Sequence, residues 1–220
     1  MCFSAGASFG ASAVLSVIGT TGVIKAKTIP QGLFAGIPFL FSIQQLSEGM
    51  LWLSLKNADL ASGQSFYTYT FLVFAMMVWP ILVPLTIRLL EKDPMRIKRI
   101  NVLLAIGITV FIGIGWVLLY FPVQVIRMDH HLHYEFDFPS KSKTGIIVFS
   151  LLYFLSTILP PFISGIKRMK WLGVVFAVSY LFAITFYSGF VVSVWCYFAA
   201  ILSLVVIWIM AGMNKPVFTY

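Results

Sequence analysis

A succession of long apolar runs limits this chain more than any other feature, because a helix crosses a hydrocarbon core with roughly 20 apolar residues. Seven runs have about this length, at 5–24, 33–55, 66–90, 100–121, 146–166, 172–189 and 191–212. Hydrophobic residues make up 60% of the chain and charged residues only 10%, a balance that excludes a soluble domain. We therefore predict an all-α integral membrane protein, a seven-transmembrane helix bundle that forms a single domain over residues 1–220.

The distribution of basic residues predicts which side of the membrane each loop faces. One set of loops carries eleven of them: Lys25, Lys27, Arg88, Lys92, Arg96, Lys98, Arg99, Lys167, Arg168, Lys170 and Lys215. The other set carries four: Lys56, Arg127, Lys141 and Lys143. Because the side richer in Lys and Arg is cytoplasmic, we expect a multi-pass protein of the cell (inner) membrane, with its N-terminus periplasmic or extracellular and its C-terminus cytoplasmic.

The net charge of +8 does not indicate a nucleic-acid partner, since the basic residues sit in short loops between the apolar runs, where membrane topology accounts for them. The loops at 91–99 and 167–170 are expected to be solvated and to meet anionic headgroups, which makes membrane lipids the expected partners. No feature of the sequence sets an oligomeric state.

Two runs carry signals for helix packing. In the first run, small residues repeat four positions apart, as Gly6 with Gly10 and as Ser8 with Ser12. Such spacing lets helices approach closely, so it predicts packing rather than a site. The run at 66–90 contains Pro80 and Pro84, which predict a kink whose freed carbonyls are satisfied by neighbouring helices.

Glu48 is the only carboxylate within any of the apolar runs. A charged side chain inside a bilayer costs a few kcal/mol, so an intramembrane Glu is a candidate functional group that faces a cavity or the bundle interior. Helical spacing places Gln44, Glu48 and Trp52 on one stripe, with Gln45 three residues before Glu48. The structural alternative is a carboxyl group satisfied by Gln or Ser neighbours, and Trp52 is also typical of the aromatic belt at a membrane interface.

The loop at 122–145 contains a period-two pattern that predicts a short β-hairpin at about 122–139 on the outer side, between the fourth and fifth helices. One face would carry His131, His133, Glu135 and Asp137, and the other Leu132, Tyr134, Phe136 and Phe138. The partner strand is expected at 123–126, with the turn near 129–130. Because a two-stranded hairpin alone is marginally stable, its apolar face should lie on the helix ends like a lid.

Groups that could bind a transition metal fall on the same predicted side. Imidazole, thiolate and carboxylate are the usual zinc ligands, so a candidate metal site would combine Cys2, Glu48, His131 and Cys196. The histidines could instead act as a pH sensor or belong to a solvated loop. For Cys2 and Cys196, three states stay open: a disulfide, two thiolate ligands, or two inert apolar residues.

Several short motifs are spread along the chain: Met1-Cys2-Phe3-Ser4-Ala5, Gln44-Gln45-x-x-Glu48-Gly49-x-x-Trp52, Trp79-Pro80-x-x-x-Pro84, His131-x-x-Tyr134 and Ser193-x-Trp195-Cys196-x-x-Ala199. Together they resemble a bacterial family of uncharacterised multi-pass membrane proteins whose sequences open with MCFSA. The resemblance spans nearly the whole chain and implies a fold and a bacterial inner membrane, without an activity. The residues that it marks are Cys2, Ser4, Gln44, Gln45, Glu48, Trp52, His131, Tyr134, Ser193, Trp195 and Cys196. His130 and His133 lie outside the pattern, which argues against a three-histidine metal site.

Taken together, the sidedness of these residues favours a polar cavity that opens outward beneath the hairpin. Its expected lining is Gln44, Gln45, Glu48, Trp52, Tyr134, Ser193 and Trp195. The leading hypothesis is binding of a small molecule or ion, with translocation as an extension and Glu48 as counter-charge or proton acceptor. Two alternatives are a metal-dependent hydrolase or redox enzyme that uses Cys2, Glu48, His131 and Cys196, and a structural or assembly protein without a ligand.

Overall fold

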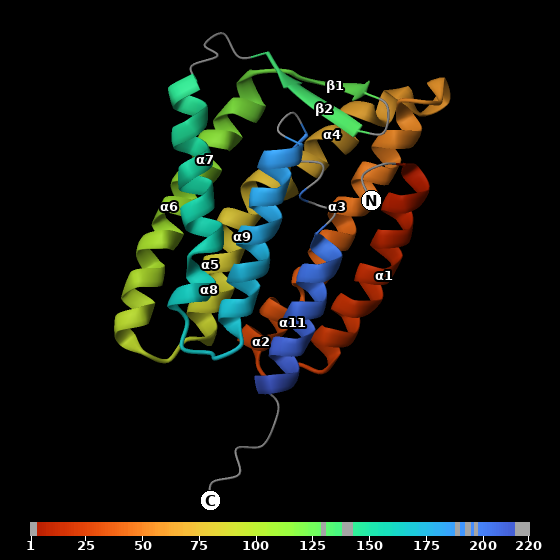
Figure 1. Cartoon of the computed structure of the whole chain (residues 1–220). Helices are drawn as coiled ribbons and strands as arrows, with labels where there is room; N and C mark the ends of the chain where they lie inside the picture. Colours follow the sequence, from red (N-terminus) through yellow and green to blue (C-terminus); the bar gives the residue numbers. More distant parts are fainter. Residues whose placement is uncertain are drawn as a thin grey trace, which may run out of the picture.

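The computed structural model describes residues 4–128, 131–137, 143–187, 190, 191, 195 and 198–213. Its helices are α1 (Ala5–Ile24), α2 (Ile29–Ala35), α3 (Ile37–Ser54), the 3₁₀ helix η1 (Ala58–Gly63), α4 (Gln64–Leu72), the π-helix η2 (Val73–Val78), α5 (Trp79–Leu90), α6 (Pro94–Tyr120), α7 (Lys143–Ile158), α8 (Pro160–Ile163), α9 (Met169–Phe186) and α11 (Ala199–Met213). The strands β1 (Val123–Met128) and β2 (His131–Phe136) form one antiparallel pair. Figure 1 shows α6 and α7 on one flank of the bundle, α1 on the other, and the hairpin across one end.

Within the described part of the chain, five helical stretches are long and apolar enough to cross a membrane. They are Ala5–Ile24, Ala58–Leu90, Pro94–Tyr120, Thr144–Ile163 and Met169–Phe186. The prediction of a helical membrane protein is thus supported. The run at 33–55 breaks at Gly36, and its longer part, α3, is less apolar than these five because it carries Gln44, Gln45 and Glu48. Ile201–Met213 is apolar but shorter, and the predicted turn at 188–189 lies outside the described residues.

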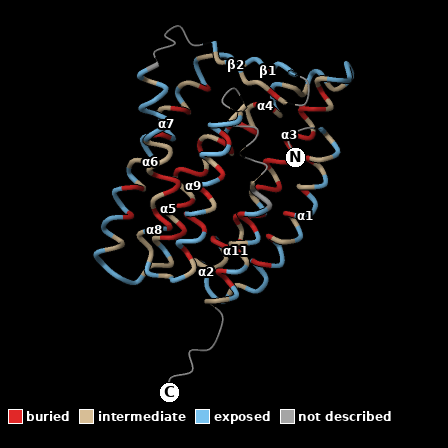
Figure 2. The backbone as a smooth tube through the Cα atoms, viewed as in Figure 1, coloured by how far each residue is buried: buried red, intermediate tan, exposed pale blue. Residues whose placement is uncertain are grey.

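The surface of the bundle is apolar. Leu119 is 83% exposed and Val17 and Phe186 are each 68% exposed, whereas Figure 2 shows buried residues mainly on the helix sides that face inward. Exposed apolar area on this scale is typical of a surface covered by lipid.

α1 and α3 pack closely side by side, as the small residues of the first run predicted. The Ser12 hydroxyl donates to the Ser42 carbonyl over 2.9 Å, and Gly19 lies so near the backbone of Phe39 that a Cβ would clash with it. Ser8 and Ser12 are buried in this interface. Gly6 and Gly10, which share the same spacing, instead have nothing within 4 Å of an added Cβ, so the packing prediction is wrong for the glycine pair.

The third span contains the π-helix η2 where the kink was predicted, and η2 ends at Val78, two residues before Pro80. Proline lacks the N–H that a π-turn would direct to the carbonyl five residues earlier, which belongs to Ala75. Tyr153 of α7 donates its hydroxyl to this carbonyl over 2.8 Å. A neighbouring helix therefore satisfies the freed acceptor, as expected for a kinked helix inside a membrane.

The hairpin lies on the helix ends with its apolar face inward. In its register Val125 pairs with Tyr134 and Arg127 with Leu132, and paired residues share one face. Leu132 is fully buried and packs with Val125, Leu51 and Trp52. The predicted strands and inward apolar face are confirmed. Residues 129–130, where the turn was predicted, and Phe138 lie outside the described residues.

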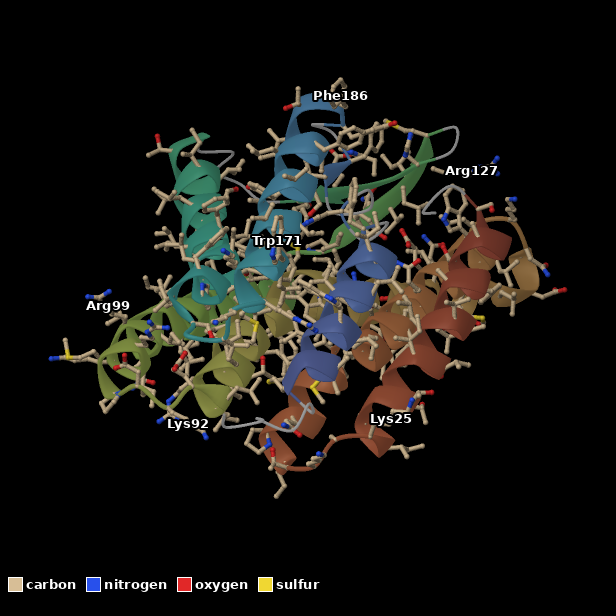
Figure 3. The ribbon with its side chains drawn as sticks, turned by 60° about the horizontal axis from the view of Figure 1, so that its bottom comes forward. Lys25, Lys92, Arg99, Arg127, Trp171 and Phe186 are labelled. Atoms are coloured by element: carbon tan, nitrogen blue, oxygen red, sulfur yellow. The ribbon has the colours of Figure 1, made fainter. Side chains whose placement is uncertain are left out.

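Basic residues gather at the end of the bundle away from the hairpin. Figure 3 shows Lys25, Lys92 and Arg99 toward this end, and Arg127 at the other. The predicted loop at 91–99 is shorter in the structure, because α6 begins at Pro94, and the carboxylates of Glu91 and Asp93 both accept hydrogen bonds. Asp93 caps α6 by accepting from the Met95 N–H over 2.8 Å.

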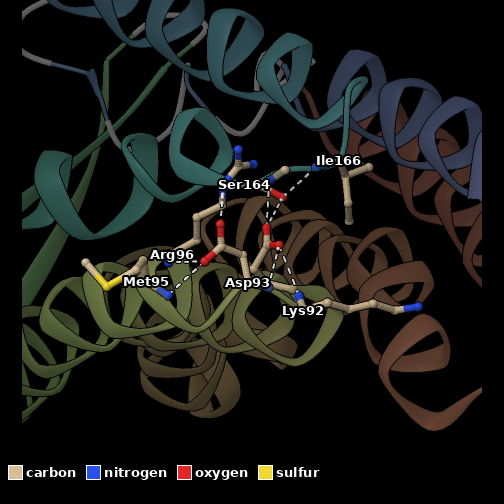
Figure 4. A network of polar contacts seen from close by, with 8 residues as sticks. Lys92, Asp93, Met95, Arg96, Ser164 and Ile166 are labelled. Carbon is tan, nitrogen blue, oxygen red and sulfur yellow. Dashed lines mark hydrogen bonds and ion pairs between the residues drawn. The ribbon is translucent and has the colours of Figure 1, made fainter.

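Glu91 joins two loops that are more than 70 residues apart (Figure 4). Its carboxylate accepts from the Gly165 N–H over 2.6 Å and the Ser164 hydroxyl over 3.2 Å. It also accepts from the backbone N–H groups of Lys92 and Asp93. Partial burial raises the pKa of Glu91, but these four hydrogen bonds favour the ionised form and leave the pKa below its usual value.

A Glu91→Gln protein should therefore lose stability only where Glu91 is ionised. Because the folded-state pKa is lowered, the stabilisation is present above the unfolded pKa of about 4.5 and is lost as pH falls through the folded value. We expect a loss of about 1 kcal/mol in unfolding free energy at pH 7, and convergence with the wild type in acid. Detergent-solubilised unfolding at several pH values measures this, and Asp59→Asn, which removes an exposed carboxylate at the hairpin end of the bundle, is the matched control. A gap that persists unchanged below pH 4 would contradict the assignment.

Candidate functional site

The polar stripe of α3 is buried in the half of the bundle that the hairpin covers. Pro38 lies in the first turn, where its missing N–H costs no hydrogen bond, and the helix then continues to Ser54. Glu48 and Gln44 are 0% exposed and Gln45 and Trp52 are 1% exposed. Glu48 lies six residues before the helix end, which is about 9 Å at the rise of an α-helix. The sequence-based expectation that Glu48 faces the bundle interior is met, and Gln44, Gln45 and Trp52 are buried with it.

Two hydrogen bonds hold the amides of the stripe. Trp79 of α5 donates its indole N–H to Gln44 Oε1 over 3.1 Å, and its ring stacks on Phe41 with centroids 4.0 Å apart. Gln45 Nε2 donates to Glu48 Oε2 over 3.3 Å. Gln45 therefore uses its amide nitrogen for Glu48, and its amide oxygen Oε1 takes no part in this contact.

Three polar atoms near this stripe are buried and have no hydrogen-bond partner among the described residues. They are Gln45 Oε1, Ser8 Oγ and Trp52 Nε1. Ser8 stands one turn before Ser12, which binds the α3 backbone at Ser42, so in this antiparallel pair it faces α3 at the level of Gln45 to Gly49. Gln45 binds Glu48 directly and Trp52 stands one turn after Glu48 on α3, so these atoms lie along the stripe that contains Glu48. A buried polar atom without a partner costs about 1–3 kcal/mol.

Trp52 is not the membrane-facing belt residue that its position in the sequence favours. The hairpin covers its ring, and the Arg127 guanidinium lies 5.8 Å from the ring centroid. Tyr134 joins the same apolar cluster and stacks on Phe71 with centroids 5.3 Å apart. The structure therefore brings Trp52 and Tyr134 together under the lid.

Other predicted site residues lie elsewhere or have structural contacts. Trp195 donates its indole N–H to Ser179 of α9 over 2.9 Å and packs against Tyr153 and Tyr180. His131 stacks on Phe190 with ring centroids 4.7 Å apart. Ser4 caps α1 by accepting from the Ala7 N–H over 3.2 Å. Cys2, Ser193 and Cys196 lie outside the described residues.

A protein-family model matches nearly the whole chain. A family model described as a family of unknown function, DUF6629, matches residues 1–219. The chain belongs to this family. No curated protein and no solved structure matches it significantly. Membership in DUF6629 agrees with the expected uncharacterised family.

A metal centre in this DUF6629 chain stays a prediction. Among the residues whose positions are described, no three His, Cys, Asp or Glu side chains lie close enough together to hold a metal ion. Of the four candidate ligands, only Glu48 and His131 belong to that part of the chain. The state of Cys2 and Cys196 is likewise untested.

Two members of the buried cluster were not recognised from sequence as site residues. The spacing of Ser8 and Ser12 predicts helix packing only, with the same signal as the spacing of Gly6 and Gly10. Trp79 appears in the sequence analysis only through its motif with Pro80 and Pro84, although its indole N–H binds Gln44. A Trp in the middle of an apolar run indicates a hydrogen-bond acceptor nearby, because a buried indole N–H needs a partner.

Proposed function

We propose that the chain is a seven-span protein of the inner or plasma membrane, forming a single domain with its N-terminus outside and its C-terminus in the cytoplasm. The positive-inside rule supports this orientation, because the basic loops cluster at the end of the bundle opposite the hairpin. α3 and α11 would supply the two spans beyond the five apolar stretches. In this orientation the hairpin and the buried stripe of α3 belong to the outer half of the membrane.

The proposed activity is binding of a small polar molecule or ion in an outward-facing pocket beside Glu48, covered by the hairpin. The observation that carries the proposal is the group of buried polar atoms without a described partner, namely Gln45 Oε1, Ser8 Oγ and Trp52 Nε1. Native proteins rarely leave such atoms unsatisfied, so each needs an explanation. A bound polar ligand supplies partners for all three.

The chemistry of the cluster favours a cation or a protonated amine. Gln45 Oε1 and Ser8 Oγ offer oxygen atoms, and the Glu48 carboxyl next to Gln45 would supply a negative counter-charge to such a ligand. The Trp52 indole N–H would orient an acceptor group of the ligand, and Tyr134 of the hairpin completes the proposed lining.

Thermal unfolding in detergent tests this proposal with defined probes. Sodium, potassium, methylammonium and putrescine chlorides are compared at equal ionic strength with N-methylglucamine chloride. A ligand present at 100 times its Kd stabilises the folded state by about 2.7 kcal/mol, which corresponds to a rise in Tm of roughly 5–10 °C for a chain of this size. We expect at least one probe to produce this rise in the wild type and none to do so in Glu48→Gln.

The matched control is Asp59→Asn, which removes an exposed carboxylate at the same end of the bundle and should keep the full response. If Glu48→Gln folds and responds to the probes as the wild type does, Glu48 is not the counter-charge. The absence of any probe-dependent shift in the wild type would count against a cation site.

A further inference from the structure

Two connections at the basic end of the bundle lie side by side and form one surface. They are 91–93, between α5 and α6, and 164–168, between α8 and α9. Glu91 joins them by accepting from the Ser164 hydroxyl and the Gly165 N–H (Figure 4). Arg96 of α6 also lies against Gly165, where an added Cβ would overlap its guanidinium. Two contacts thus hold the start of α6 and the α8–α9 connection together.

The joined surface is strongly positive. Residues 91–99 contain four basic and two acidic residues, and residues 164–170 contain three basic residues and no acidic one. Glu91 is committed to hydrogen bonds within the fold, and Asp93 caps α6 and pairs with Arg96 over 3.4 Å. The exposed basic residues of the surface are Lys92, Lys98, Arg99, Lys167 and Lys170.

Apolar side chains beside this charge indicate the headgroup level of a bilayer. Trp171 directly follows Lys170 and is 51% exposed, and Met95 in the first turn of α6 is 63% exposed. An exposed Trp next to basic residues at a helix end is typical of a membrane–water interface. A partner at this level combines an anionic group with an apolar part. This is the chemistry of an anionic phospholipid rather than of a soluble acidic protein or a nucleic acid.

We propose that Glu91 joins the two basic segments into one binding surface for a single anionic phospholipid. Lys92 directly follows Glu91, and Lys167 stands two residues after Gly165, so the two lysines border the hydrogen bond between Glu91 and Gly165. Both lysines contact the phosphate of the lipid, and Glu91 is a positioning residue that does not touch it. The surface lies at the opposite end of the bundle from Glu48, so it is independent of the proposed outer pocket.

Native mass spectrometry of the detergent-solubilised full-length protein tests the surface. The protein is titrated with phosphatidylglycerol, with phosphatidylcholine of the same acyl chains, and with phosphatidylglycerol in the presence of inorganic phosphate. We expect the wild type to retain one phosphatidylglycerol with at least tenfold preference. Lys92→Gln and Lys167→Gln should each weaken binding of this lipid about fivefold, the contribution of one basic residue near an anionic headgroup. Lys56→Gln, at an exposed lysine of the hairpin end, should bind as the wild type does.

Glu91→Ala separates the positioning role of Glu91 from its charge. Removal of a carboxylate alone raises the affinity of a surface for an anion. Asp93→Asn removes such a charge from the same surface and keeps a side chain that caps α6, so it should strengthen phosphatidylglycerol binding by up to about fivefold. Glu91→Ala also removes the acceptor that holds Ser164 and Gly165. We therefore expect it to weaken binding at least threefold in the folded protein.

Four results would overturn the proposal. Equal retention of the two lipids by the wild type would mean annular lipid only. Unchanged binding in either Lys92→Gln or Lys167→Gln would exclude that lysine from a joint surface. A rise in Glu91→Ala like that in Asp93→Asn would show that Glu91 acts through its charge alone. Displacement of phosphatidylglycerol by inorganic phosphate at equal concentration would assign the surface to a free anion.

Discussion

A Gly107→Ala protein is expected to lose about 3 kcal/mol of unfolding free energy. Gly107 of α6 lies against the Pro80 carbonyl of α5, so closely that an added Cβ would overlap the carbonyl oxygen and lie 2.7 Å from its carbon. Pro84 has no N–H to bond this carbonyl within the helix, which leaves the oxygen facing α6. Because the obstacle is backbone, relief requires α5 and α6 to separate, and overpacking of this kind costs at the upper end of the usual 1–3 kcal/mol.

Gly10→Ala is the internal control for this prediction. The substitution is the same, but the added Cβ meets nothing, so helix propensity should stabilise the protein by up to about 1 kcal/mol. Reversible unfolding in mixed micelles, titrated with SDS, compares the two. If Gly107→Ala proved as stable as Gly10→Ala, the close packing of α5 on α6 would be wrong.

Leu132→Ala should loosen the lid. Leu132 is fully buried against Leu51 and Trp52, and truncating a buried Leu costs about 2–5 kcal/mol. A two-stranded hairpin has little stability of its own, so the loss should appear as local opening rather than global unfolding. We expect amide exchange in β1 and β2 to accelerate at least thirtyfold, measured by hydrogen exchange with mass spectrometry.

Ile126→Ala provides the comparison in the same hairpin. Ile126 is 39% exposed and, by the register, points to the opposite face. Its truncation should change exchange by less than threefold. Similar acceleration in both variants would show that the hairpin does not rest on α3 through Leu132.

The elements that could be predicted from sequence are those set by local patterns. Apolar runs of bilayer length predicted the long helices, and alternation over 131–136 predicted β2 and its inward Leu132. The cost of an intramembrane carboxylate predicted that Glu48 would be buried. Each of these inferences depends on a periodicity or a length that the chain displays within about 20 residues.

Features that depend on how helices are rotated or covered could not be predicted in this way. Ser8 and Gly10 belong to pairs with the same spacing, and only the rotation of α1 against α3 decides which pair is buried. Trp52 has the position of a belt residue, and only the hairpin folded over it makes it part of the core. Glu91 lies in a charged loop, and its partners Ser164 and Gly165 are 73 and 74 residues away.

The most direct test of the central claim is an experimental structure of the full-length protein in lipid nanodiscs, at a resolution that reveals ordered water and ions. The account predicts non-protein density beside Glu48, within hydrogen-bonding distance of Gln45 Oε1 and at least one of Ser8 Oγ and Trp52 Nε1. Tight packing of protein side chains on all three atoms, with no density or void between them and Glu48, would contradict the proposed binding site.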